Sequence, residues 1–468
     1  MVTTTNEVSS STPSVKHKPR RALFIAYGFP PVGGVSVHRA TKFVKYLPEF
    51  GWEVSVLTVA NPSVPLFDES LLGEIPPETR IRRARTLEPG YAFKSTISKR
   101  DETQDAGFAA RVVQKARDAA RRAFTLFMQP DPQILWRPHA LREGVKLLRE
   151  VPHDVVVVTG PPFSSFLLGM TLAKRMNLPL AVDFRDEWSI MCYWENKKVG
   201  VVDRIVQGRM QANVLRAADL VISTTPATAD ELRALVNASG GKARVDHIYN
   251  GFDPSDYPVA ASGEERIDYG SGPSLFRMVF VGTLWNVTPI TPLVDGIVEL
   301  AKRSPHLASK LELVIAGRRT DQQEVQLDRL ASTQVKLVRL PFVAHKTAIQ
   351  LMCQADAQLL INADMPDTDR LINAKAFEYM AARRPIFVIA PEGEMWRLLA
   401  DMPGTLSARP GDVESISANL QTAIMRWQDG TVDYQSRWNL AEFERRNLTG
   451  RLAAHLDELV SNRAVRGG

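Results

Sequence analysis

The feature that most constrains the fold is a regular alternation between short apolar runs and amphipathic helical patterns. Runs rich in Val, Ile and Leu without strict alternation are typical of parallel strands that are covered on both faces. In the first half of the chain, strands are expected at 22–27, 52–59, 154–160, 180–184 and 220–224, with helices at 35–47 and 165–176. This order predicts a doubly wound, Rossmann-like α/β domain over residues 21–255.

The same pattern starts again in the second half of the chain. Strands are expected at 277–282, 311–317, 335–340, 357–361 and 386–390, with helices near 291–303, 345–354 and 374–383. Between the two halves, residues 251–274 are dense in Gly, Pro, Ser and Asp, which is typical of a linker. The sequence therefore predicts a second Rossmann-like domain over residues 275–431.

Composition and cysteine content indicate the cellular compartment of the protein. The 468 residues, 44% of them hydrophobic, are enough for two domains with separate cores. The two cysteines, Cys192 and Cys353, have no metal-ligand spacing, and residues 1–20 resemble a disordered tail without the apolar stretch of a signal peptide. No run reaches the roughly 18 apolar residues of a membrane span. We therefore expect a cytoplasmic protein.

The net charge of +6 fits nucleic acid, an anionic membrane or a phosphorylated substrate, and does not choose among them. Basic side chains concentrate in residues 108–128, a predicted amphipathic helix with Arg111, Lys115, Arg117, Arg121 and Arg122. Such a segment could lie on an anionic membrane surface. An ordinary helix with a solvated basic face is the favoured interpretation, and membrane contact stays open.

Ligands of doubly wound sheets bind beyond the carboxyl ends of the strands, so the loops there are the candidate sites. After the first predicted strand, Gly33 and Gly34 precede a helix and would let its free N–H groups approach an anion. A plain tight turn explains this pair equally well. The loop is not GxGxxG, and the chain contains no Walker A, GxSxG or zinc motif.

Charged residues follow the strand predicted at 180–184. Asp183, Arg185 and Asp186 lie at its carboxyl end, where they form either a structural ion pair or part of a site. The position at the strand end favours the site.

The stretch 367–390 carries a cation and an anion in a helix that otherwise resembles core. Asn373 is the predicted N-cap of this helix. Lys375 then lies in the first turn, where a cation opposes the helix dipole unless a negative ligand is present. Glu378, one turn further, could accept two hydrogen bonds from a vicinal diol. The alternative is an i, i+3 salt bridge, worth about 0.2–0.5 kcal/mol on an exposed helix.

A family resemblance rests on seven segments in order between residues 22 and 390: GFPPVGGVSVHRATKFVKYLPEFGWEVSVLT, TGPPFSSFLLG, AVDFRDEW, AADLVISTTP, IYNGFD, FVGTL and NAKAFEYMAARRPI. Together they resemble family 4 of the retaining, sugar-nucleotide-dependent glycosyltransferases of GT-B fold, especially a bacterial branch in polysaccharide and glycan assembly. The resemblance implies two domains facing a central cleft, the first for the acceptor and the second for the nucleotide sugar. It implies C-terminal helices, at 432–468, that cross back to the first domain.

The activity that the resemblance implies is transfer of a sugar from a nucleotide diphosphate sugar to a hydroxyl of a glycan or lipid-linked glycan. The transfer would be retaining and would need no metal or other cofactor. Expected partners are the donor, the acceptor and, through residues 108–128, the inner membrane face, but no nucleic acid.

Roles carry over from the family to single residues. Glu378 falls on the second of two glutamates eight positions apart and resembles a ribose clamp, while Gly282, Asn373 and Ala374 fall in the donor loops. Gly33 and Gly34 match the loop at the cleft. Asp183, Arg185 and Asp186 match the strand end where acceptor and reacting sugar meet; the family often has a His there, so no firm base is assigned.

Two positions depart from the family. The first glutamate, which contacts the donor sugar, is replaced by Arg370, with Asp369 as a possible substitute. The phosphate-binding Arg and Lys are replaced by Thr283 and Thr288. The charge on the diphosphate would then come from Lys375, Arg370 and Arg318, with Lys375 assisting the leaving group as the glycosidic bond breaks.

Three alternatives follow from these observations. Asp367 and Asp369 could be the Asp-x-Asp of a manganese-dependent GT-A enzyme. The chain could be a nucleotide-sugar epimerase of GT-B fold, which acts without an acceptor. Arg370 and Thr283 also fit a degenerate subunit that binds sugar nucleotide without turnover.

Overall fold

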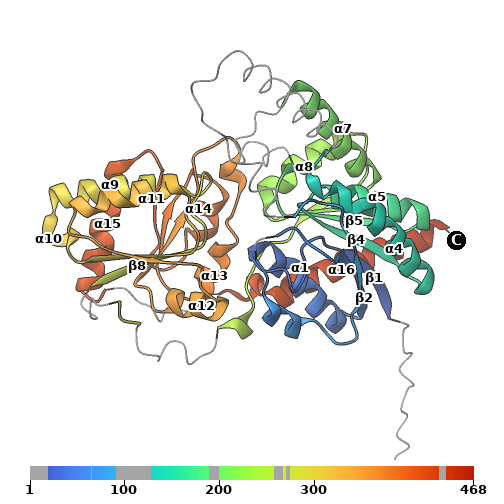
Figure 1. The fold of residues 1–468 in the computed structure, drawn as a ribbon, viewed down its shortest axis with the longest axis horizontal. Helices are drawn as coiled ribbons and strands as arrows, with labels where there is room; N and C mark the ends of the chain where they lie inside the picture. Colours follow the sequence, from blue (N-terminus) through green and yellow to red (C-terminus); the bar gives the residue numbers. More distant parts are fainter. Residues whose placement is uncertain are drawn as a thin grey trace, which may run out of the picture.

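The structure is a computed structural model that describes residues 19–64, 66–90, 128–188, 200–257, 267–269, 275–431 and 439–467. Two α/β lobes lie side by side, each built around one parallel sheet (Figure 1). Residues 1–18 of the tail predicted at 1–20, and nearly all of the basic segment 108–128, lie outside the described residues. The membrane-facing role of that segment therefore stays a prediction. The predicted end of the tail is wrong, because the first strand already begins at Arg20.

The N-terminal lobe contains a sheet in the order β3-β2-β1-β4-β5-β6-β7, with all described pairs parallel. Its strands are β1 Arg20–Ile25, β2 Trp52–Val59, β3 Arg80–Ala84, β4 Val155–Gly160, β5 Leu180–Phe184, β6 Leu220–Ser223 and β7 Arg244–His247. The α-helices are α1 Val35–Tyr46, α4 Arg137–Glu150, α5 Ser164–Met176, α7 Val201–Ala217 and α8 Pro226–Ala238. Short 3₁₀ helices are η1 Leu47–Phe50, η2 Glu69–Glu74, η3 Pro132–Trp136 and, after the sheet, η4 Pro254–Asp256.

The C-terminal lobe repeats this architecture with the order β10-β9-β8-β11-β12-β13. Its strands are β8 Phe276–Val281, β9 Leu311–Ala316, β10 Lys336–Leu340, β11 Ala357–Ile361, β12 Ile386–Ile389 and β13 Leu406–Ala408. The α-helices are α9 Thr291–Arg303, α10 Pro305–Ala308, α11 Asp321–Asp328, α12 His345–Cys353, α13 Lys375–Ala381, α14 Glu394–Leu399 and α15 Val413–Gln428, and the chain ends with α16 Arg445–Gly467, which packs on the other lobe. Short 3₁₀ helices are η6 Arg329–Ser332, η7 Thr368–Arg370 and η8 Ala441–Phe443.

The predicted fold of two doubly wound α/β domains is confirmed. Every strand expected from an apolar run is present, with ends shifted by at most two positions. The strands that the sequence did not predict, β3, β7 and β13, are short and form sheet edges. Edge strands are only partly covered, as in β3 and β7, and so lack the continuous apolar run that marks the central strands.

The last helix belongs to the N-terminal lobe although it follows the C-terminal lobe in sequence. On α16, Leu448, Leu452 and Leu456 recur every four positions, are buried, and pack with the core beneath α1. Figure 1 shows α16 running across to the lobe that contains α1 and β1. The predicted crossing of the C-terminal segment back to the first domain is therefore confirmed.

The chain thus crosses between the lobes twice, and the two crossing segments pair with each other. The amide of Phe252 donates to the carbonyl of Phe443 at 3.0 Å, and the amide of Arg445 donates to the carbonyl of Phe252 at 2.7 Å. Gly251 stands beside this pair with φ of 67°, a left-handed conformation that favours glycine. A Cβ there would lie 2.3 Å from both the Phe443 carbonyl oxygen and Leu448 Cδ1. We call residues 251–252 and 443–445 the hinge.

Replacing Gly251 tests how tightly the hinge is packed. Gly240 is the matched control, because its φ is 73° and nothing lies within 4 Å of a Cβ built there. Gly240→Ala should cost only the left-handed strain, about 1–2 kcal/mol. Gly251→Ala adds overpacking of about 1–3 kcal/mol and should lower the melting temperature further. Equal melting temperatures for the two variants would contradict this account of the hinge.

Candidate functional site

The carboxyl ends of the strands of each sheet carry the loops that the sequence singled out. The loops after β1 and β5 come from the N-terminal lobe, and those after β8, β9 and β11 come from the C-terminal lobe. A polar cavity is lined from both lobes, by His38, Lys42, Gly251, Phe252, Asp253, Asp256, Tyr257, His345, Glu378 and Arg445. We call this the hinge cavity.

Lys375 begins α13 and lies against the end of β8. Its Nζ stands 4.7 Å from the centre of the Phe280 ring, and a Cβ at Gly282 would lie 1.9 Å from it. Only a glycine at 282, which has φ of 140°, leaves this space. Burial lowers the pKa of Lys375 to about 8. Within the described ranges, its ammonium group has no hydrogen-bond or ion-pair partner, which suits a site that awaits an anion.

Glu378 lies one turn along α13 and lines the hinge cavity. Its carboxylate forms no salt bridge with Lys375, so the two side chains do not neutralise each other directly. Burial raises the pKa of Glu378, while His345, Arg445 and Lys375 pull it the other way. The backbone carbonyl of Glu378 accepts a hydrogen bond from the Tyr257 hydroxyl at 3.2 Å, which fixes the helix against the linker.

The predicted cap of α13 is wrong. Ala374 occupies the N-cap position without a side-chain hydrogen bond. The side-chain Nδ2 of Asn373 instead donates to the Ile361 carbonyl at 3.1 Å and to Asn362 Oδ1 at 2.7 Å. Asn373 therefore ties the start of α13 to the end of β11. No side chain caps α13, and the first-turn amide of Ala376 donates to the backbone carbonyl of Asn373 at 2.9 Å.

The loop after β8 contains Thr283 and Thr288, and a hydrogen bond between them stabilises it. The buried Thr288 hydroxyl donates to the Thr283 carbonyl at 2.7 Å, whereas the Thr283 side chain is exposed. Arg318, after β9, is also exposed, and its backbone carbonyl accepts from the Leu284 amide at 2.9 Å. These loops bring Gly282, Thr283 and Arg318 to the same edge of the sheet as Lys375.

On the N-terminal lobe, Gly33 and Gly34 connect β1 to α1. The Gly33 amide donates to the Leu66 carbonyl at 3.1 Å, and a Cβ at Gly33 would meet Leu66 at 3.0 Å. Gly34 is the N-cap of α1, with φ of 99° and nothing within 4 Å of an added Cβ. Gly33 is thus held by packing, while Gly34 borders open space at the helix start.

The three charged residues at the end of β5 have different roles. Asp183 is buried and accepts hydrogen bonds from Arg39 at 2.8 and 3.1 Å and from the Thr159 hydroxyl at 2.8 Å. It forms the structural ion pair that the sequence left as the alternative, so its predicted catalytic role finds no support in the geometry. Arg185 folds back onto the carbonyls of Gly160 and Pro161.

Asp186 keeps a carboxylate without hydrogen bonds or ion pairs to the part of the chain that the structure describes. Burial raises its pKa. Of the three predicted residues, Asp186 is therefore the one available to a ligand.

Arg370 bridges the two lobes. Its guanidinium donates to Glu187 Oε2 at 2.8 Å and to Glu231 Oε2 at 3.2 Å, both in the N-terminal lobe, and pairs with Asp367 at 3.1 Å. The Arg370 carbonyl also accepts from the Thr225 hydroxyl at 2.8 Å. The residue that replaces the family's first glutamate is thus engaged across the cleft, which leaves Lys375 and Arg318 as the basic candidates without such partners.

The sequence missed Glu187 and Glu231. Glu187 is separated from Arg370 by 183 positions, and its side chain is only 3% exposed. Burial raises the pKa of Glu187 to about 7, against the opposing effects of Arg370 and the Thr228 hydroxyl. No local pattern links such distant residues, so only the closed arrangement of the lobes identifies them.

Replacing Arg370 should weaken the contact between the lobes. Arg370→Met leaves the buried Glu187 without its cation, at a cost of about 3–5 kcal/mol near pH 8. Because a raised carboxyl pKa means that the protonated form is favoured in the folded state, the loss should shrink as the pH falls below about 7 and Glu187 becomes neutral. Thermal unfolding of wild type and variant at pH 8 and pH 5.5 measures this difference.

Glu231→Gln is the control for that measurement. Glu231 is 41% exposed, so its pair with Arg370 should contribute at most about 1 kcal/mol. A loss in Arg370→Met that is no larger than in Glu231→Gln, or that does not depend on pH, would show that the buried pair does not hold the lobes together.

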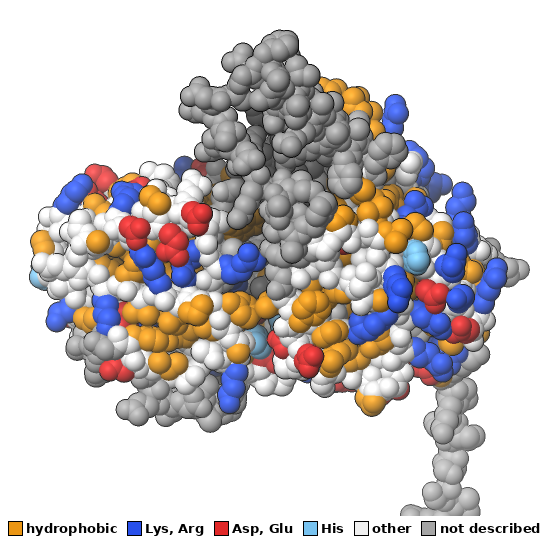
Figure 2. Space-filling view, viewed as in Figure 1, with side chains coloured by type: hydrophobic (Ala, Val, Ile, Leu, Met, Phe, Trp, Pro, Cys, Tyr) orange, Lys and Arg blue, Asp and Glu red, His pale blue; other side chains and the backbone are white. Residues whose placement is uncertain are grey.

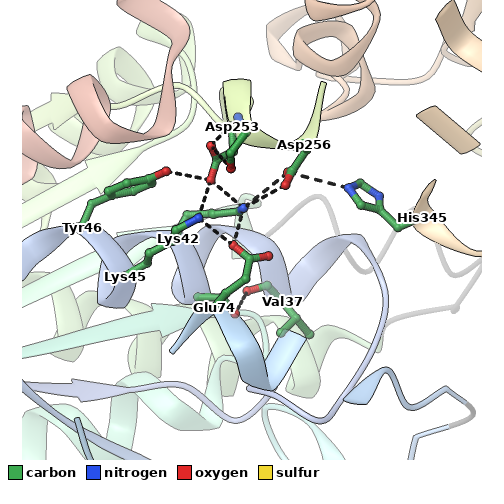
Figure 3. Close-up of polar contacts among 10 residues, drawn as sticks. Val37, Lys42, Lys45, Tyr46, Glu74, Asp253, Asp256 and His345 are labelled. Atoms are coloured by element: carbon green, nitrogen blue, oxygen red, sulfur yellow. Dashed lines mark hydrogen bonds and ion pairs between the residues drawn. The ribbon is translucent and has the colours of Figure 1, made fainter. Parts of the chain in front are cut away.

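A second polar network forms part of the lining of the hinge cavity. Lys42 Nζ donates to Asp253 at 2.7 Å and approaches Asp256 at 3.3 Å, and His345 Nε2 lies 3.7 Å from Asp256 (Figure 3). Burial opposes ionisation of Asp253, but Lys42 and Lys45 hold its pKa well below its ordinary value. These contacts connect α1, the linker and α12. The carboxylates of Asp253 and Asp256 are therefore already paired within the protein.

In the view of Figure 2, Lys and Arg side chains gather at the end of the N-terminal lobe that lies farthest from the C-terminal lobe. None of the helices that the structure describes combines the length and apolar character needed to cross a membrane.

The two lobes with a cleft between their strand ends define the GT-B class of glycosyltransferase folds. HepE of Anabaena, solved with UDP and glucose, superposes with a TM-score of 0.60 at 16% identity over 94% of this chain and 100% of that chain. WaaG, a glycosyltransferase involved in lipopolysaccharide biosynthesis, gives a TM-score of 0.52 at 13% identity over 95% of this chain and 98% of WaaG. These likenesses support the fold, and the GT-A interpretation of Asp367 and Asp369 is wrong.

Residues 33–251 match the glycosyl transferase 4-like domain. The D-inositol 3-phosphate glycosyltransferase of Actinosynnema mirum is 26% identical over 229 residues, which are 48% of this chain and 49% of that protein. An uncharacterised glycosyltransferase of Methanocaldococcus jannaschii is 26% identical over 213 residues, 44% of this chain and 51% of that protein. The match spans about half the length of these curated relatives. The predicted resemblance to family 4 glycosyltransferases is confirmed.

Proposed function

We propose that the protein transfers a sugar from a nucleotide diphosphate sugar to a hydroxyl group. The observation that carries this proposal is the pair of unneutralised charges on α13, Lys375 and Glu378, at the carboxyl end of β11. A cation in the first turn and an anion one turn later, without a salt bridge between them, suit a ligand with an anionic part and a hydroxyl-bearing part. A nucleotide diphosphate has both parts.

Each charge has a distinct chemical role in this proposal. Lys375, in the first turn of α13, binds the diphosphate and stabilises the negative charge that develops on it as the glycosidic bond breaks. Glu378 accepts hydrogen bonds from the ribose hydroxyls. Gly282 permits the diphosphate to approach the backbone beside Lys375. Arg318 is exposed at the same edge and adds positive charge.

The finer points of the reaction rest on the family resemblance and on the neighbours. HepE was solved with UDP and with UDP-glucose, which supports a UDP-sugar as the first donor to test. The proposed transfer is retaining, metal-independent and directed to a glycan or lipid-linked glycan acceptor. Asp186, which is half-buried at the end of β5, is the proposed contact to the acceptor.

Binding of UDP-sugars by calorimetry tests the donor site. Glu378→Gln removes an ionised acceptor of hydrogen bonds, each worth about 1.5–3 kcal/mol, so affinity should fall at least about tenfold. Glu78→Gln is the control, because Glu78 is an exposed carboxylate in the N-terminal lobe. If no UDP-sugar, GDP-sugar or ADP-sugar binds to the wild type, or if Glu378→Gln binds as tightly as Glu78→Gln, the donor site is wrong.

Turnover separates the transferase from its two rivals. A transferase should release nucleotide diphosphate only when an acceptor is present and should keep its rate in excess EDTA. Conversion of the sugar nucleotide without an acceptor would favour the epimerase. Binding without turnover across a panel of glycan and lipid-linked acceptors would favour the degenerate subunit, and loss of activity in EDTA would contradict a metal-independent transfer.

A further inference from the structure

The first two turns of α7 carry a cluster of exposed aliphatic side chains. Val201 is 64% exposed, Val202 59% and Ile205 49%. Among the described residues, no other exposed large hydrophobic side chains lie so close together in the sequence. A single exposed aliphatic residue needs no explanation, whereas a contiguous apolar patch marks an interaction site. The start of α7 is therefore a candidate contact surface.

The helix geometry shows that this cluster faces away from the protein. Val201, Ile205 and Arg209 recur every four positions and so lie on one side of α7. Met210 and Val214 lie on the other side, where they pack in or against the core of the N-terminal lobe. The exposed aliphatic side is therefore not the side on which the helix packs.

Polar contacts hold this end of α7 in place. Asp203 Oδ1 accepts a hydrogen bond from Gln129 Nε2 at 2.9 Å, and Gln207 Nε2 donates to Gln129 Oε1 at 2.6 Å. Trp188, which follows β5 and stacks on Phe163 with ring centres 4.7 Å apart, donates from Nε1 to Gln207 Oε1 at 3.3 Å. The exposed side is thus presented by a helix that is tied to the segment after β5.

The charge around the cluster is positive. Arg204 and Arg209 are exposed, and neither pairs with an acid in the part of the chain that the structure describes. The neighbouring helix α5 contains no acid and ends with the exposed Lys174 and Arg175. Figure 1 shows α7 at the outer edge of the N-terminal lobe, where Figure 2 shows hydrophobic side chains next to Lys and Arg. We call the following residues the α7 surface: Val201, Val202, Arg204, Ile205 and Arg209.

The mixture of aliphatic and basic side chains chooses among the partners that the net charge of +6 leaves open. Nucleic acid binds Arg and Lys through its phosphates and stacks its bases on aromatic side chains. The α7 surface contains no aromatic residue, so nucleic acid would leave its aliphatic side chains in water. A small phosphorylated substrate has the same shortcoming. A lipid bilayer with anionic head groups satisfies both kinds of side chain.

A second copy of the chain fits the α7 surface less well. A stable protein interface buries about 1,200–2,000 Å², far more than three aliphatic side chains offer. A symmetric dimer through this surface would also bring the arginines of the two copies together, and the surface contains no acid to pair with them.

We propose that the α7 surface docks on an anionic lipid bilayer. Its three aliphatic side chains enter the boundary between head groups and acyl chains, and its two arginines bind lipid phosphates. This inference goes beyond the proposed function and does not depend on it, because docking requires no turnover. The α7 surface is separate from the basic segment 108–128, and it belongs to the same lobe as Asp186.

Sedimentation of the full chain with lipid vesicles tests the docking. Vesicles of equal parts phosphatidylcholine and phosphatidylglycerol should bind the wild type, and vesicles of phosphatidylcholine alone should bind it much more weakly. Val201→Ser combined with Ile205→Ser should lower partitioning onto the anionic vesicles at least about tenfold, because two aliphatic side chains no longer leave water. Val325→Ser is the matched control, since Val325 is 62% exposed on α11 of the C-terminal lobe. It should bind as the wild type does.

The basic half of the surface is tested separately. Arg204→Gln combined with Arg209→Gln should lower partitioning onto the anionic vesicles about tenfold and should weaken its dependence on salt. Arg426→Gln, at an exposed position of α15 in the C-terminal lobe, is the control. All of these side chains are exposed, so each variant should keep the melting temperature of the wild type and its affinity for sugar nucleotides.

Three results would overturn the inference. The first is a wild type that does not sediment with the anionic vesicles. The second is wild-type partitioning of both α7 variants, which would assign membrane binding to another surface. The third is a dimer in light scattering that Val201→Ser with Ile205→Ser converts to a monomer, because the surface would then serve a second copy. If the wild type binds vesicles but no sugar nucleotide, the docking stands and the proposed function falls.

Discussion

The structure depends on the pairing of the two segments by which the chain crosses between its lobes. Tyr249 from the first crossing, Phe377 of α13 and Phe443 from the second crossing form one aromatic cluster, with ring centres 5.5–5.7 Å apart. Backbone hydrogen bonds of Phe252 join the same segments. Because α13 also carries Lys375 and Glu378, the contact that orients the lobes also positions the candidate donor site.

Charged groups near the cleft divide into those that hold the structure and those left for a ligand. Arg370 is paired across the lobes with Glu187 and Glu231, and Asp183 is saturated by Arg39 and Thr159. Lys375 and Glu378 have no such partners in the described structure. Compared with the family, the acid expected at 370 is replaced by a base whose acidic partners stand on the opposite lobe. This exchange converts a predicted sugar contact into a bridge between the lobes.

Sequence patterns predicted the elements that are buried on both faces, because these need a continuous apolar run. All six residues of β4 are buried, and its boundaries were predicted to within one position. The edge strands β3 and β7 escaped prediction because they are partly exposed and their residues carry no such run. Local chemistry was less reliable: Asn373 has the composition of an N-cap, but hydrogen bonds to Ile361 and Asn362 proved more favourable than capping its own helix.

By itself, the sequence determined two doubly wound lobes, the placement of Lys375 and Glu378 on one helix after β11, and the family resemblance, since each of these follows from local periodicity and short motifs. Only the tertiary structure decided which charges are already neutralised. Asp183 and Arg39, or Glu187 and Arg370, meet because separate strands and lobes bring distant segments together. Glu378 and Arg445 likewise line one cavity only because α16 returns to the first lobe.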